Sequence, residues 1–211
     1  MTVTISRLYD DPIAAQQGVR DLEAAGIPSR DISIVASNAD DWYRGDSKMK
    51  RKVDRDHDGK DDRAEGAAAG AGIGAALGGA AGVLAGLGIM AIPGLGPVVA
   101  AGWLAAAATG AVAGGATGGI IGALTQSGVS KSDAEIYAEG VRRGGTLVTA
   151  KCRDGDRVRC EAIMDQAAIN IREREDAWRD AGWTGYDPTA RPYTAEQIRI
   201  ERETYREPPM R

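Results

Sequence analysis

Apolar and polar residues alternate with two different periods along the chain. Residues 2–6 alternate in steps of two, which is typical of a strand. Residues 12–25 repeat apolar side chains at helical spacing, with a proline in the first turn and a glycine just after the end. Residues 32–35 are rich in isoleucine and valine and predict a second strand. Residues 1–37 therefore form a predicted β-α-β half.

Residues 131–172 repeat this order as a predicted α-β-α-β half. The predicted elements are a helix that Ser132 and Glu135 cap and Gly144-Gly145 ends, a strand at 146–152, a helix at 156–168 and a last short strand at Ile169–Ile171. Neither half is long enough to bury a core alone. We therefore expect an α+β fold in which two split ferredoxin-like βαβ halves flank an insertion.

The insertion contains a long segment without charge. Residues 66–130 include no Asp, Glu, Lys, Arg or His. The sequence Pro-Gly-Leu-Gly-Pro at 93–97 breaks any helix and divides the segment into two arms. Each arm exceeds the ~20 residues that cross a ~30 Å hydrocarbon layer. We therefore predict a helical hairpin with arms at about 66–92 and 98–126.

Glycine recurs at every fourth position in both arms, which places it along one face of each predicted helix. A glycine face lets another helix approach closely, so that dispersion and weak Cα–H···O contacts hold the pair. The predicted hairpin is therefore a glycine zipper. The predicted helix-packing residues are Gly66, Gly70, Gly74, Gly78, Gly82 and Gly86 in the first arm and Gly110, Gly114, Gly118 and Gly122 in the second.

Two environments suit this hairpin. Arm length and the exclusion of charge favour insertion into the inner membrane, with lipid as the partner. Lysine and arginine flank both ends while the turn has none, and the N-terminus carries no secretory signal, so both flanking domains are expected in the cytoplasm. Trp103 fits an interfacial anchor. Arms of alanine and glycine are only weakly hydrophobic, which leaves a soluble cytoplasmic homo-oligomer with hairpins in a shared core as the alternative.

A charged linker at residues 38–65 carries a candidate calcium loop. Residues 54–65 fit D-x-D-x-D-G-x5-E, a spacing that directs alternate carboxylates at one hard cation. The candidate Ca²⁺ ligands are Asp54, Asp56, Asp58, Asp62 and Glu65. Asp61 stands where calcium loops prefer an apolar residue, and acidic residues also suit a helix N-terminus. A calcium- or ligand-responsive sensor and a solvated acidic linker are both consistent with the pattern.

Composition and motifs point away from catalysis and from nucleic acid. The sequence has no nucleophile elbow, no P-loop and no Cys–His pair of plausible spacing. Cys152 and Cys160 are interpreted as free thiols and His57 as a loop residue. A net charge of −4 does not favour nucleic-acid binding. Residues 173–211 are predicted to be a charged, partly disordered tail with a short helix capped at Thr194.

Several stretches resemble a known family. Residues 8–11, 19–28 and 31–35 resemble the bacterial heat-induced general stress protein domain (YflT-type). Residues 137–148 and the glycine-rich hairpin resemble its membrane-inserted relatives. The resemblance covers most of residues 1–172. It implies a stress-associated, non-enzymatic protein and carries no active-site residues over.

Overall fold

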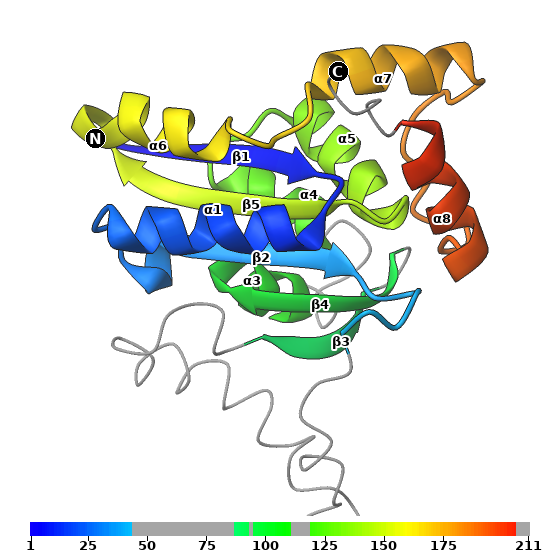
Figure 1. Cartoon of the computed structure of the whole chain (residues 1–211), viewed down its shortest axis with the longest axis horizontal. Coiled ribbons are helices and arrows are strands. Elements are labelled where there is room, and N and C mark those ends of the chain that lie inside the picture. Colours follow the sequence, from blue (N-terminus) through cyan, green and yellow to red (C-terminus); the bar gives the residue numbers. More distant parts are fainter. Residues whose placement is uncertain (44–86, 93–94, 111–118, 206–211) are drawn as a thin grey trace, which may run out of the picture.

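The computed structural model describes residues 1–43, 87–92, 95–110 and 119–205. These residues form an antiparallel sheet with helices on both faces (Figure 1). The strands are β1 (Thr2–Tyr9), β2 (Ile32–Ser37), β3 (Gly88–Ile92), β4 (Gly96–Gly102) and β5 (Thr146–Arg153). The α-helices are α1 (Pro12–Ala24), α3 (Trp103–Gly110), α4 (Gly119–Gln126), α5 (Lys131–Arg142), α6 (Arg157–Met164), α7 (Ile171–Asp180) and α8 (Ala195–Thr204). The expected α+β class is confirmed.

The sheet joins the two halves of the chain. Its order is β1-β5-β2-β4-β3. Both β1 and β2 pair antiparallel with β5, with Ile5 opposite Ala150 and Ile34 opposite Val148. Consequently β1 and β2 run parallel, with β5 between them. The strand from the second half therefore completes the core of the first half, as neither could do alone.

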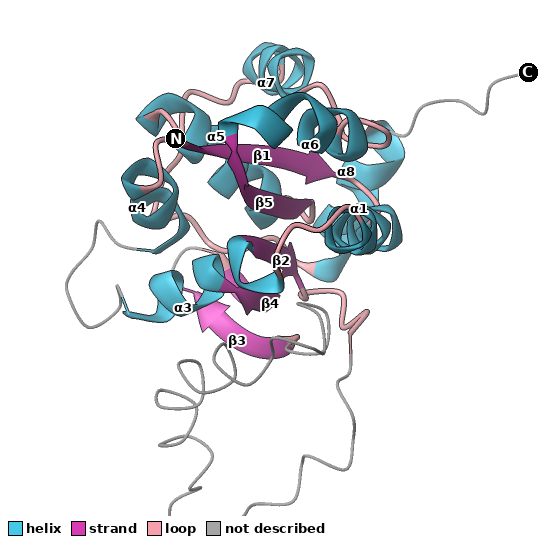
Figure 2. Ribbon diagram, turned by 90° about the vertical axis from the view of Figure 1, so that its left-hand side faces the viewer, coloured by secondary structure: helices cyan, strands magenta, loops and turns pink. Residues whose placement is uncertain are grey.

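Each face of the sheet has its own hydrophobic core. Helices α1 and α6 cover one face, and α3, α4 and α5 cover the other (Figure 2). On the α1 side, Val19 and Leu22 are fully buried against the sheet. On the other side, Leu104 and Leu124 are fully buried. The sheet alternates its side chains between these cores, as the period of two predicts.

Local capping fixes where the helices start. The Asp11 carboxylate accepts a hydrogen bond from the Ile13 N–H at 2.9 Å, and Pro12 occupies the first turn of α1 as predicted. Helix α5 starts at Ser130, whose Oγ accepts from the Asp133 N–H at 3.1 Å. The predicted cap at Ser132 therefore lies two residues too far along the chain.

The prediction of two helical arms is wrong at residues 88–92 and 96–102, which form the β-hairpin β3-β4. Met90 pairs with Val98, and β4 pairs in turn with β2. Val98 and Val99 are almost completely buried. Because β4 pairs with β2, these β-branched side chains are buried within the sheet. The proline-glycine sequence between the strands suits a turn in a β-hairpin as well as in a helical hairpin.

The second arm continues as α3 and α4, whose apolar side chains enter the core beneath the sheet. Gly102 ends β4 with φ at +86°, and the helical part of the second arm begins only at Trp103. Trp103 is half-buried at the start of α3, with the Lys151 Nζ 3.8 Å from its ring centroid. The Lys151 ammonium group therefore forms a cation–π contact with Trp103 within the domain.

One prediction near the C-terminus is also wrong. The short strand at Ile169–Ile171 is absent, because the Asn170 side chain accepts hydrogen bonds from two N–H groups and caps α7. Residues 173–205 of the predicted tail pack on the domain through α7 and α8, where Trp178 is 1% exposed and Ile198 is fully buried. The predicted capping box at Thr194 is confirmed at the start of α8.

Candidate functional site

The five candidate calcium ligands, Asp54, Asp56, Asp58, Asp62 and Glu65, lie outside the described residues. Within the part of the chain that the structure describes, no group of three or more His, Cys, Asp or Glu side chains is placed to hold a metal ion. The calcium loop therefore remains a prediction.

Most of the predicted helix-packing glycines also lie outside the described residues. Gly110 is the last residue of α3, and Gly122 lies within α4. Those two helices pack against each other on one face of the sheet. The glycines outside the description are Gly66, Gly70, Gly74, Gly78, Gly82, Gly86, Gly114 and Gly118. Among the described helices, none combines the length and apolar character required to span a membrane.

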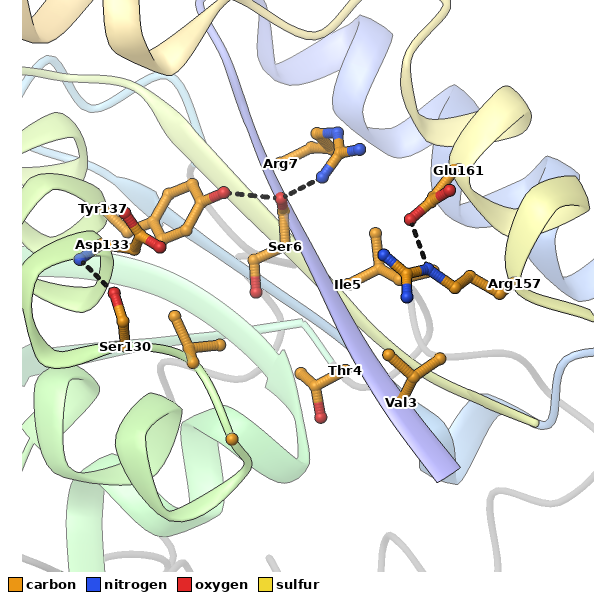
Figure 3. A pocket seen from close by; sticks show the side chains of 12 residues that line it. Val3, Thr4, Ile5, Ser6, Arg7, Ser130, Asp133, Tyr137, Arg157 and Glu161 are labelled. Carbon is orange, nitrogen blue, oxygen red and sulfur yellow. Dashed lines mark hydrogen bonds and ion pairs between the residues drawn. The ribbon is translucent and has the colours of Figure 1, made fainter. Parts of the chain in front are cut away.

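The structure instead presents a groove along β1 (Figure 3). It follows Val3–Arg7, and its volume is about 240 Å³. One wall comes from residues 128–130 and the first turns of α5, where Asp133 and Tyr137 lie. The other wall comes from α6. This volume is below the ~300–1,000 Å³ of typical cofactor or ligand pockets. The groove therefore suits a narrow ligand better than a nucleotide-sized molecule.

Hydrogen bonds hold the backbone and walls of the groove together. The Tyr137 hydroxyl donates to the Ser6 carbonyl oxygen at 2.7 Å, and Arg7 Nη1 donates to the same oxygen at 2.9 Å. The Thr4 hydroxyl donates to the Ser127 carbonyl at 2.7 Å. These bonds tie β1 to α5 and to the turn after α4, so the groove is built from fixed elements.

The charged side chains around the groove have partners of opposite sign. Arg7 pairs with Asp165 at 2.5 Å, and Arg157 pairs with Glu161 at 2.8 Å. Asp133 pairs with Arg172. Burial lowers the pKa of Arg7, but the bond to Asp165 more than offsets this and leaves the pKa above its ordinary value. Burial raises the pKa of Tyr137 against the opposing effect of Arg7, so its hydroxyl remains a donor at neutral pH.

A second cluster of polar groups joins α5 to α8. Glu139 is completely buried, and it accepts hydrogen bonds from Arg142 and Arg143 at 2.6 Å each. Arg143 also reaches Glu201 at 3.2 Å, and the Trp178 Nε1 donates to Glu201 at 2.7 Å. Because these groups satisfy one another, the cluster fastens the C-terminal helices to the domain.

The two thiols lie in the core between the sheet and α6. Cys152 and Cys160 are both buried. Burial, together with a hydrogen bond to Cys160, raises the pKa of Cys152 to about 12. A nucleophilic cysteine needs a thiolate near neutral pH. Cys152 is therefore suited to packing.

No family model, curated protein or solved structure matches the chain. The fold and the groove define its class as an α+β protein with an antiparallel sheet between two helical layers and a strand-edge groove on one side.

Sequence reasoning missed the groove and the buried cluster for different reasons. The strand at 2–6 is visible in the sequence, but its place at the edge of the sheet depends on pairings between distant segments. The buried cluster had a local signal in Glu139, Arg142 and Arg143, whose spacing puts opposite charges on one helix face. That signal alone does not tell a buried pair from a solvated one.

Proposed function

We propose that this chain is a non-enzymatic, stress-associated protein that self-associates through the glycine row of its first arm, residues 66–86. The stress association rests on the resemblance of residues 1–172 to the general stress protein domain. The self-association rests on the position of the second arm, whose described apolar side chains lie in the core of the domain.

In the predicted hairpin, the glycine row of one arm packs on the row of the other. The described parts of the second arm are occupied elsewhere, because Val98, Leu104 and Leu124 are fully buried in the core of the domain. A row of glycines in a helix costs up to ~1 kcal/mol per residue relative to alanine unless close packing compensates. We infer that the packing partner of residues 66–86 is the same segment of another copy.

A second observation bears on the membrane alternative. The Tyr43 hydroxyl donates to the Leu87 carbonyl at 3.2 Å, so the segment between these residues leaves and rejoins the domain at one place. If residues 66–86 crossed a bilayer, residues 44–65 would have to cross back. That stretch is rich in Lys, Arg and Asp, each of which costs ~2.5–3.5 kcal/mol at the bilayer centre. Self-association is therefore favoured over a spanning anchor.

The deciding experiment adds bulk to the glycine face. Gly74→Leu with Gly78→Leu should block close approach and reduce the sedimentation mass from oligomer to monomer. Ala76→Leu with Ala80→Leu places two leucine side chains on the opposite face of the predicted helix and should leave the mass unchanged. An unchanged mass for the glycine variant would refute self-association through this row. Recovery of the wild type only in detergent-extracted membranes would instead support membrane anchoring.

We also propose that β1-α1-β2, β5 and α6 are a ferredoxin-like frame that carries residues 38–130 as an insertion. The support is the split β-α-β arrangement and the common position of α1 and α6 on one face. In a complete β-α-β-β-α-β frame, a last strand follows the second helix. Here α7 follows α6, which leaves β1 at the edge.

A further inference from the structure

The sheet has two edge strands, β1 and β3, and their outer sides differ. At β1, the Ser6 carbonyl accepts hydrogen bonds from the Tyr137 hydroxyl and Arg7 Nη1. The Leu8 carbonyl accepts from the Ile169 N–H. At the opposite margin of the sheet (Figure 1), no hydrogen bond from the described residues reaches the backbone of β3 on the side away from β4. Of the two edges, β3 therefore offers unpaired backbone groups to a further strand.

Pro97 indicates which groups of β3 point outward. In an antiparallel pair of strands, residue pairs that exchange both hydrogen bonds alternate with pairs that exchange none. Ala91 lies opposite Pro97, which has no N–H, so this pair is of the second kind. Met90 then exchanges hydrogen bonds with Val98, whereas Ile89 and Ala91 direct N–H and C=O away from β4. The outer edge of β3 therefore carries both donors and acceptors.

The sequence of β3 lacks the features that keep edge strands apart. Natural edge strands are protected by charged side chains, by proline, by a bulge or by a covering element. Residues 88–92 are Gly-Ile-Met-Ala-Ile, without charge or proline. Each residue from Gly88 to Ile92 has its own partner in β4, so no bulge interrupts the strand. A regular, uncharged edge of this kind favours pairing with another strand.

The strand that fits this edge is β3 of a second copy. About a twofold axis at Met90, Ile89 of one copy lies opposite Ala91 of the other, and each such pair exchanges both hydrogen bonds. The outward donors and acceptors of the two strands are then all paired. Residues 66–86, the proposed self-association segment, are separated from β3 by Leu87 alone. Two copies joined there therefore hold their β3 strands at a high effective concentration.

We propose that β3 pairs antiparallel with β3 of a second copy, which joins two five-stranded sheets into one continuous sheet across a twofold axis. This inference rests on the proposed self-association through residues 66–86, and it adds a second interface that orients the two copies. The glycine row brings the copies together, and the backbone hydrogen bonds of Ile89 and Ala91 set their register.

Cysteine substitutions in the full-length chain test the register by oxidative cross-linking. Met90→Cys places the two thiols at the twofold axis, where the opposite Cα atoms of a pair without hydrogen bonds lie ~4.5 Å apart. Ile92→Cys is the matched control on the same face of the strand, and its two copies lie ~14 Å apart along the strands. Because disulfides need Cα atoms within ~7 Å, we expect covalent dimers from Met90→Cys and none from Ile92→Cys. Dimers from both variants, or from neither, would overturn the proposed register.

Amide hydrogen exchange of the isotope-labelled wild-type chain tests the pairing without a change in β3. In the oligomer, the Ile89 and Ala91 amides should exchange as slowly as the Met90 amide, which is bonded within the sheet. In the monomeric variant Gly74→Leu with Gly78→Leu, the Met90 amide should stay protected. The two outward amides should then exchange about tenfold faster or more, because no partner strand covers them.

The outcomes separate the two proposals. An oligomer in which the Ile89 and Ala91 amides exchange rapidly would overturn β3 pairing and leave self-association through the glycine row standing. A monomeric wild-type chain would overturn both. Equally slow exchange in the oligomer and the monomeric variant would show that another segment of the same chain covers the edge, and it would also overturn β3 pairing.

Discussion

At the scale of single residues, Gly102 is the position where β4 ends and the chain enters α3. Its φ is +86°, and a Cβ atom there would lie 2.2 Å from the Ile32 carbonyl oxygen. Two costs therefore act against any other residue, namely the left-handed backbone and the collision with the neighbouring strand. The sequence marks a glycine here but gives no sign of the strand that approaches it.

Gly102→Ala should lower the free energy of unfolding by about 3 kcal/mol, because backbone strain and collision add. Gly128→Ala is the matched control, since φ at Gly128 is +97° and nothing lies within 4 Å of an added Cβ atom. It should cost only the ~1–2 kcal/mol of the left-handed conformation. Urea denaturation measures both variants, and equal losses would contradict the close approach of β2.

Titration of buried residues should weaken the fold at high pH. Burial raises the pKa of Tyr9 to about 12, from an ordinary value of 10.0. It also raises the pKa of Cys152 to about 12, from 9.0. Below pH 9 both groups are protonated in the folded and the unfolded chain, so their contribution to stability is complete. Between pH 9 and 12 the unfolded chain loses these protons first, and stability falls.

Urea denaturation at pH 7, 9 and 10.5 checks this dependence. Tyr9→Phe removes one of the titrating groups and also the hydrogen bond to the Met164 carbonyl. It should lower stability by ~0.5–1.5 kcal/mol at pH 7 but reduce the further fall above pH 9. An identical alkaline fall in wild type and variant would show that Tyr9 does not contribute.

At the scale of elements, α8 tests whether the C-terminal region belongs to the core. Ile198→Ala removes a fully buried side chain and should cost ~2–5 kcal/mol. Ile200 lies on the same helix and is 52% exposed, so Ile200→Ala should stay within about 0.5 kcal/mol of wild type. Chemical denaturation followed by tryptophan fluorescence measures both variants, and Trp178, which donates to Glu201 of α8, is among the four tryptophans that contribute to the signal. Similar small effects for both variants would mean that α8 is detached in solution.

Sequence reasoning succeeded where an element carries its own signal. The first strand, α1 with Pro12, and the capping box at Thr194 all appear as predicted. It failed at β3 and β4, where alanine, glycine and valine fit a strand or a helix and pairing with β2 decides. It also missed α7, because a charged sequence does not indicate that Trp178 is buried or that Glu175 pairs with Arg179.

At the scale of the whole molecule, the mixed α+β class was predictable, and the location of the described part of the charge-free segment was not. Two incomplete halves must share a core, and β5 lies between β1 and β2 accordingly. Arm length and missing charge favour a membrane hairpin, whereas the weak hydrophobicity of alanine and glycine leaves a buried hairpin as the alternative. The edge groove also emerges only at this scale, because it needs β1, α5 and α6 together.

The central claim, that residues 66–86 pair between copies through their glycine face, is tested most directly by oxidative cross-linking. Gly74→Cys places a thiol on the glycine face and Ala76→Cys on the opposite face, while the native Cys152 and Cys160 are buried. Disulfides form only where Cα atoms approach within about 7 Å. We predict covalent dimers from Gly74→Cys and none from Ala76→Cys. Equal cross-linking of both variants, or of neither, would contradict the claim.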